Sequence, residues 1–268
     1  MQQGQYSGGE PKSDWGNQGQ WEPRQEPPRS GRGRRGRVGP GAAAAANAMP
    51  AERIQFIQRT YMHLIGAIAA TVVGMFLFAF SPLYVPVMTF LFESSGNTGW
   101  FLVLGLFIFG TMFAEHLAHR TSRALQYVGL FTSVAIFSLI LNLPVAFALA
   151  SGGGQVVIQA LMITFFTFGA LTVMVFRSGI DFSILRTGLV VGGVLSFGAI
   201  IAAIFFGFTL GLGFIILMVG YMAAMITYQT SEIYHKYRTD QHVGAATGLY
   251  VSVGILFWYV LHLVGWGD

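Results

Sequence analysis

Residues 187–231, TGLVVGGVLSFGAIIAAIFFGFTLGLGFIILMVGYMAAMITYQTS, contain no Asp, Glu, Lys or Arg across two successive apolar stretches. A helix needs about 20 mostly apolar residues to cross the hydrocarbon core of a bilayer. Glycines between 207 and 211 separate the two stretches, so we expect transmembrane helices at 187–207 and 211–231. Comparable apolar stretches predict five more spans, at about 61–80, 99–117, 124–143, 156–176 and 244–264.

The composition also favours an integral membrane protein. Of the 268 residues, 54% are hydrophobic and only 10% are charged, whereas soluble domains average about 25% charged residues. The chain has no cysteine, which excludes disulfides and thiolate metal sites. The predicted fold class is therefore all-α, with seven transmembrane helices.

The basic residues are distributed asymmetrically. All 15 Lys and Arg residues lie before the first apolar stretch or in every second gap between stretches. The gaps that contain them hold Arg120 with Arg123, Arg177 with Arg186, and Lys236 with Arg238. Loops rich in Lys and Arg remain on the cytoplasmic side of a membrane. We therefore predict a cytoplasmic N-terminus and a C-terminus on the outside.

The first 50 residues differ in composition from the rest of the chain. Residues 1–50 are rich in Gly, Gln, Pro, Arg and Ala and cannot bury enough apolar surface to offset the entropy of ordering. We predict a disordered cytoplasmic tail followed by a membrane domain at 52–265. A basic run in the tail is expected to attract anionic lipid, at about 1 kcal/mol per residue; it comprises Arg32, Arg34, Arg35 and Arg37. There are two alternative roles for this basic run: it could be a signal that keeps the N-terminus in the cytoplasm, or it could contact nucleic acid. Of these, we do not expect a nucleic-acid partner.

Small residues recur at a spacing that suits helix packing. Gly188 with Gly192 and Gly244 with Gly248 form GxxxG pairs, which allow helices in lipid to approach closely. Small side chains occupy much of the seventh stretch, so a helix this thin suits the centre of a bundle. Pro144 is expected to end or kink the third helix.

Few ionisable side chains lie at membrane depth. Glu115 and His116 stand near the cytoplasmic end of the second stretch, and His119 follows one turn later. Residues three and four apart share a helix face, so these three could bind a metal ion. Pairing of Glu115 with a neighbouring basic group is the alternative. No catalytic motif stands out, and we expect neither enzymatic activity nor a cofactor.

The most polar intramembrane region spans the cytoplasmic halves of the last two stretches. Thr227 to Ser231 lie on one stretch, and Thr247, Tyr250 and Ser252 lie on the other. Such groups could line an ion pathway, or they could link helices through hydrogen bonds worth about 0.6–2 kcal/mol each. Both interpretations are open at this point.

Four motifs follow one another along the predicted spans. They are FIQRTYMHL at 56–64, RSGIDFSIL at 177–185, YQTSEI at 228–233 and LYVSVGILF at 249–257. In their order and spacing, the chain resembles the Bax inhibitor-1 family, the transmembrane Bax inhibitor motif proteins, over about 52–265. Asp181, Phe182 and Ser183 match a short cytoplasmic loop of the family, and Asp240 matches an acidic residue before the last helix. The resemblance implies six helices around a central seventh, and a bacterial-type member in the cytoplasmic membrane.

The resemblance also implies a function, a pH-sensitive calcium leak. In the family, two aspartates on the last two helices share a proton and supply the pH switch, and a basic residue near the end of the second helix latches the closed state. Here Gln229 and Ser252 occupy the aspartate positions, and Arg120 or Arg123 matches the latch. Because neutral oxygens bind calcium more weakly than carboxylates do, we expect a leak that is weak in calcium and insensitive to pH.

The candidate ion pathway includes the neighbours of these two positions. Its residues are Gln229, Ser252, Tyr228, Thr230, Glu232 and Tyr250. Glu232, one turn after Gln229, either replaces part of the missing charge or points to the cytoplasmic rim. The alternative function is a scaffold without transport that regulates another membrane protein, such as a membrane-bound protease. Eukaryotic members of the family are associated instead with restraining stress-induced cell death.

Overall fold

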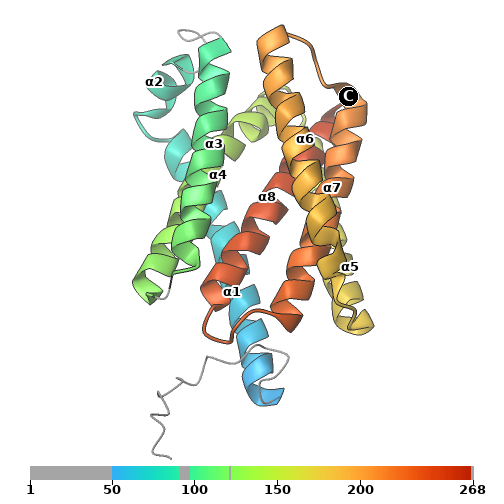
Figure 1. Cartoon of the computed structure of the whole chain (residues 1–268). Helices are drawn as coiled ribbons and strands as arrows, with labels where there is room; N and C mark the ends of the chain where they lie inside the picture. Colours follow the sequence, from blue (N-terminus) through green and yellow to red (C-terminus); the bar gives the residue numbers. More distant parts are fainter. Residues whose placement is uncertain (1–49, 91–96, 121, 267–268) are drawn as a thin grey trace, which may run out of the picture. The chain divides into compact units, whose positions relative to one another are not determined.

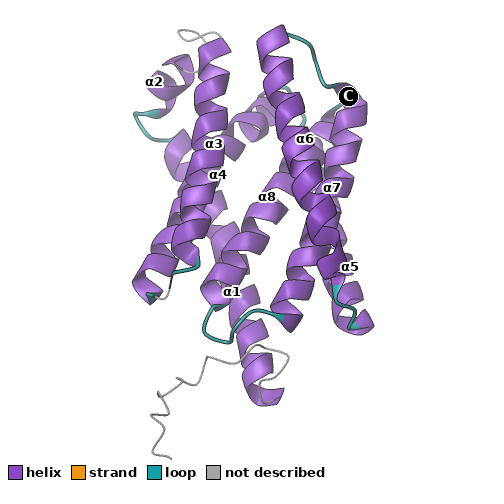
Figure 2. Cartoon of the chain, in the orientation of Figure 1, coloured by secondary structure: helices purple, strands orange, loops and turns teal. Residues whose placement is uncertain are grey.

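A computed structural model describes residues 50–90, 97–120 and 122–266 of the chain, and this part consists of helices joined by turns (Figure 2). Seven of the described helices are long and apolar enough to cross a membrane. They are α1 (Pro50–Ala79), α3 (Asn97–Ala118), α4 (Arg123–Ala150), α5 (Gly154–Ser178), α6 (Leu185–Phe206), α7 (Gly211–His235) and α8 (His242–Gly265). The predicted fold class and number of spans are confirmed. The predicted tail, with Arg32, Arg34, Arg35 and Arg37, lies outside the described residues.

Two short elements complete the chain order. The helix α2 (Tyr84–Thr89) connects α1 to α3, and the 3₁₀ turn η3 (Phe182–Ile184) precedes α6. Neither was anticipated, since a helix of one or two turns leaves no periodic pattern in the sequence.

Two helix boundaries differ from the sequence expectation. The helix α1 begins at Pro50, well before residue 61, because proline fits the first turn of a helix and the polar residues that follow remain good helix formers. The helix α4 runs through Pro144 to Ala150, so this proline does not end it. A proline inside a transmembrane helix is tolerated when neighbouring groups satisfy the backbone that it frees.

The last helix, α8, is the central one. It packs against α1, α3, α4, α5 and α7, and 56% of its span is buried, against at most 39% for any other span. In Figure 1, α8 (red) lies between the α3 and α4 pair and the α6 and α7 pair. The helix α6 packs mainly on α7 and η3, so it joins the ring of helices through α7.

Glycine decides how closely α3, α4 and α8 approach one another. A β-carbon at Gly129 of α4 would lie 2.4 Å from the carbonyl oxygen of Ala114, and one at Gly244 of α8 would lie 2.7 Å from that of Ala118. Both glycines therefore meet the backbone of α3 directly. The predicted GxxxG contact on α6 is wrong, because Gly188 has no atom within 4 Å of its β-carbon position and Gly192 faces the ring of a tyrosine rather than a helix backbone.

Candidate functional site

Alternate turns bring the basic gaps together at one end of the bundle, which we call the basic end. It carries the turns between α3 and α4, between α5 and α6, and between α7 and α8, drawn at the bottom of Figure 1. The charged pairs of these turns are Arg120 and Arg123, Arg177 and Arg186, and Lys236 and Arg238. That this end faces the cytoplasm stays a prediction.

Gln229 and Ser252 both belong to the interface between α7 and α8. The amide nitrogen Nε2 of Gln229 lies 3.7 Å from the β-carbon position of Gly248 on α8, and its oxygen Oε1 is buried without a hydrogen-bond partner. Ser252 is buried one turn beyond Gly248, on the same face of α8. Gln229 lies six residues before the end of α7 and Ser252 ten residues after the start of α8, hence about 9 Å and about 15 Å from the basic end.

Thr230 faces a different set of neighbours, from α1 and α5. Its side chain is fully buried, and it and Thr172 are the hydroxyl groups that approach the hydroxyl of Tyr61. None of these three buried hydroxyls makes a hydrogen bond of acceptable geometry. We call Tyr61, Thr172 and Thr230 the polar cluster. Buried polar groups without partners are costly, so a water molecule or a small cation would be stabilised among them.

Two other pathway candidates are engaged in ordinary interactions. The hydroxyl of Tyr250 on α8 bonds to Oγ1 of Thr71 on α1 at 2.5 Å, and Thr71 in turn donates to the carbonyl oxygen of Ala67 at 2.9 Å. Tyr250 is therefore a link between helices. Glu232 pairs with Lys236 at 3.6 Å, which directs its carboxylate along α7 toward the basic end. Glu232 was expected either to replace part of the missing charge or to point to the rim of the membrane domain. The contact with Lys236 fits the second of these.

Tyr228 is half-buried on α7, one turn before Glu232. These two side chains are close enough to interact electrostatically. Tyr228 therefore belongs to the surroundings of the rim carboxylate, next to Gln229 in sequence but turned to another face of α7.

The short loop before α6 is held by its own acidic residue and by α7. A carboxylate oxygen of Asp181 accepts a hydrogen bond from the backbone N–H of Ser183 at 2.9 Å. This backbone hydrogen bond holds the pKa of Asp181 below its ordinary value, because it favours the charged form. The backbone N–H of Phe182 donates to the hydroxyl of Ser231 on α7, also at 2.9 Å. The loop motif is thus a structural cap that docks on α7.

Two of the three candidate metal ligands, His116 and His119, have hydrogen-bond partners of their own. Arg120 donates to Nε2 of His116 at 2.6 Å. His119 contacts the carbonyl oxygen of Glu115 through Nδ1 at 2.8 Å and the hydroxyl of Tyr237 through Nε2 at 3.1 Å. Burial raises the pKa of Tyr237, so its hydroxyl keeps its proton and can donate to Nε2, while a proton on Nδ1 of His119 satisfies the contact with the carbonyl oxygen. Within the described ranges, no three His, Cys, Asp or Glu side chains gather as a metal site would require.

The latch candidates do not contact the two aspartate positions. Among the residues that the structure describes, no hydrogen bond or ion pair joins Arg120 or Arg123 to Gln229 or Ser252. Arg123 instead lies at the start of α4, close to the first residue of α8. Asp240, in the turn before α8, pairs with Arg238 at 3.2 Å.

Several residues of these sites escaped the sequence interpretation. Tyr61 and Thr172 complete the polar cluster, and the rings of His63 and His242 lie close together at the basic end, with centroids 5.1 Å apart and planes tilted by 60°. A polar residue inside each apolar stretch was the available signal, but nothing in the sequence showed that these positions share an interface.

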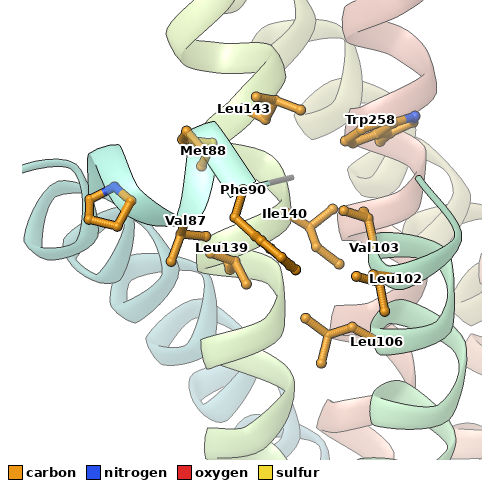
Figure 3. Close-up of a pocket in the computed structure, with 11 residues that line it drawn as sticks. Val87, Met88, Phe90, Leu102, Val103, Leu106, Leu139, Ile140, Leu143 and Trp258 are labelled. Carbon is orange, nitrogen blue, oxygen red and sulfur yellow. The ribbon is translucent and has the colours of Figure 1, made fainter. Parts of the chain in front are cut away.

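An apolar cavity of about 440 Å³ lies toward the opposite end of the bundle (Figure 3). Side chains from α2, α3, α4 and α8 line it, among them Met88, Leu106, Ile140 and Trp258. Its walls suit a hydrocarbon chain rather than an ion. It is therefore separate from the polar cluster in both place and chemistry.

The chain is similar to proteins of a known family. Residues 53–268 match the family described as Inhibitor of apoptosis-promoting Bax1 (Bax1-I). A BI1-like protein of Arabidopsis thaliana is 28% identical over 188 residues, which are 65% of this chain and 68% of the plant protein. An uncharacterized protein of Pseudomonas aeruginosa is 31% identical over 140 residues, 50% of this chain and 58% of that protein.

Proposed function

The chain belongs to the Bax inhibitor-1 family, and from this premise we propose that it is a slow cation leak whose pathway follows the interface of α7 and α8. The observation that carries the proposal is the side-chain amide of Gln229: its oxygen Oε1 is buried without a partner, and its nitrogen Nε2 lies 3.7 Å from the β-carbon position of Gly248 on α8. An unpaired carbonyl oxygen at membrane depth is a ligand for water or a cation. Ser252, one turn deeper on α8, supplies the next oxygen along the same face.

The proposed leak is weak in calcium and insensitive to pH. Calcium binds most strongly to carboxylate oxygens, and positions 229 and 252 offer only an amide and a hydroxyl. Neither group titrates between pH 5 and 9, so neither can act as a pH switch. Glu232 does not replace the missing charge, because its carboxylate pairs with Lys236.

The rate is expected to be low because the pathway is polar over only part of its length. Beyond Ser252, the buried side chains of α8 are apolar and include Leu256 and Val260. An ion could pass this region only if α7 and α8 moved apart. The leak would then depend on rare opening events rather than on a permanent pore.

A scaffold that regulates another membrane protein, such as a membrane-bound protease, is the second candidate. Two observations favour it: both aspartate positions are neutral, and α8 is locked against α3 by the close approach at Gly244. In either case we place the basic end in the cytoplasm of a bacterial cell, since the positive-inside rule assigns it there.

Calcium flux into proteoliposomes, measured at pH 6 and pH 8, separates the two candidates. The wild-type chain is compared with a variant that carries Gln229→Asp and Ser252→Asp. A matched control carries Gln229→Asn and Ser252→Asn, which have nearly the same shape as the aspartates but no charge.

We expect a low wild-type flux that is equal at the two pH values, and an increased, pH-dependent flux only in the aspartate variant. Strong pH-dependent flux in the wild type would overturn the assignment of these two positions. If none of the three proteins passes cations, the leak proposal fails and the scaffold remains.

A further inference from the structure

His242, the first residue of α8, is buried at the basic end with an unpartnered ring nitrogen. Its side chain is only 9% exposed, and its Nδ1 has no hydrogen-bond partner. His63 of α1 lies beside it, but the nitrogens of that ring are already bonded to the carbonyl oxygen of Arg59 at 2.7 Å and to the hydroxyl of Tyr127 at 2.9 Å. His242 therefore has an unsatisfied polar group among satisfied neighbours.

The charged groups around His242 are predominantly basic. Arg59 of α1, Arg123 of α4 and Asp240 are near enough to act on it electrostatically. Asp240 is already paired with Arg238 at 3.2 Å. Neither Arg59 nor Arg123 forms an ion pair within the part of the chain that the structure describes. The exposed guanidinium groups of Arg59 and Arg123 are therefore available to bind an anion near His242.

The backbone adds to the positive potential. Two helices, α4 and α8, begin at Arg123 and His242, and neither N-terminus has a hydrogen bond from a capping side chain. The first N–H groups of a helix carry a partial positive charge and attract anions. Because Arg123 and His242 are themselves the first residues of these helices, both helix starts belong to this group of residues.

We propose that Arg59, Arg123 and His242 form a binding site for a phosphate group between α1, α4 and α8. Two arginines supply charge and paired N–H donors, the geometry that phosphate oxygens prefer. The ring nitrogen Nδ1 of His242, protonated in one neutral tautomer, donates to a third oxygen. The site lies at the ends of membrane-spanning helices, so it is at the level of lipid head groups, and the same chemistry would accept free phosphate.

The test uses the full chain, purified in a nonionic detergent. Phosphatidylglycerol, phosphatidylcholine with the same acyl chains, and inorganic phosphate are titrated separately. The thermal unfolding midpoint is measured at each concentration, and retained lipid is counted by native mass spectrometry. The variants are Arg59→Gln, Arg123→Gln, both together, and His242→Leu. The matched control is Arg177→Gln with Arg186→Gln, which removes the same charge at the same end but on α5 and α6.

We expect phosphatidylglycerol to raise the wild-type midpoint more than phosphatidylcholine does. Each arginine removed should weaken the apparent affinity about fivefold, which corresponds to about 1 kcal/mol per basic residue near a membrane surface. The control should bind like the wild type. His242→Leu should fold, because it replaces a buried unpaired group by an apolar one, and should lose the preference for the anionic lipid.

If inorganic phosphate alone raises the unfolding midpoint, and the same variants lose this effect, the result would support the site and identify its ligand as a soluble phosphate. Equal weakening in the control would show diffuse attraction to a basic surface and overturn the proposal. Absence of any preference for anionic lipid or phosphate in the wild type would overturn it as well.

Discussion

Replacing Gly129 by alanine should drive a methyl group into the backbone of α3. The new β-carbon would lie 2.4 Å from the carbonyl oxygen of Ala114 and 2.7 Å from the backbone nitrogen of Ala118. Ordinary van der Waals contact begins at 3.4 Å, so the two helices must separate by about 1 Å. A separation of this size loses a quarter to a half of the dispersion energy of each contact that it opens. Neither backbone atom can turn aside as a side chain would.

The magnitude follows from two opposing terms. Overpacking a tight interface costs about 1–3 kcal/mol, and a clash with backbone belongs at the upper end of that range. Alanine in place of glycine inside a helix returns about 1 kcal/mol. We therefore expect Gly129→Ala to lower the free energy of unfolding by about 2 kcal/mol. Gly105→Ala, in α3 with no atom within 4 Å of the new β-carbon, is the control and should be neutral or slightly stabilising.

Equilibrium unfolding of both variants by sodium dodecyl sulfate in mixed micelles would measure the difference. The two variants should differ by about 2–3 kcal/mol in free energy of unfolding, and Gly105→Ala should be the more stable. If Gly129→Ala were as stable as its control, α3 and α4 would not be in contact at this glycine and the packing described for the bundle would be wrong.

Two further predictions concern polar groups. Thr71→Val should cost about 1–3 kcal/mol of unfolding free energy, because it leaves the buried hydroxyl of Tyr250 unpaired. Tyr250→Phe should cost less, about 0.5–1.5 kcal/mol, because Thr71 keeps its hydrogen bond to the backbone. The same micelle assay measures both variants, and the reverse order of the two costs would contradict the prediction. Asp181→Ala should lower the thermal midpoint at pH 7, since the depressed pKa of Asp181 means that folding favours its charged form. That contribution is present above the ordinary pKa of about 3.9 and disappears as the pH falls through the lower folded value, so the wild type and the variant should converge at acidic pH. A constant difference down to pH 3 would argue against the role of the Ser183 hydrogen bond.

The sequence predicted the number of spans and the central helix correctly, but not every helix end or helix contact. The seven spans and the central place of the last helix followed from apolar length and from the small residues of α8, among them Gly244. Pro144 was expected to end or kink the third helix, but α4 continues beyond it to Ala150. The pair Gly188 and Gly192 had the same spacing as Gly244 and Gly248 without the same contact. Spacing identifies a possible helix face, but only packing shows whether another helix lies against it.

The candidate site was predictable only in part. Gln229 and Ser252 were placed together through a family resemblance, and both line the interface of α7 and α8. Tyr61 and Thr172 were not anticipated, because a tyrosine or a threonine in an apolar stretch occurs in many structural roles. The two arginines considered as latches are equivalent by sequence, yet Arg120 bonds to His116 while Arg123 faces the start of α8.

By itself the sequence determined how many helices cross the membrane and which turns are basic, because apolar length and charge are properties of consecutive residues. The tertiary structure alone decided which polar groups meet. Tyr61 meets Thr172 and Thr230, and His242 has Arg59 and Arg123 near it, because the rotation of each helix about its axis is set by side chains that interlock across helices far apart in the chain. A contact of this kind depends on three or more helices at once, so no local pattern of residues encodes it.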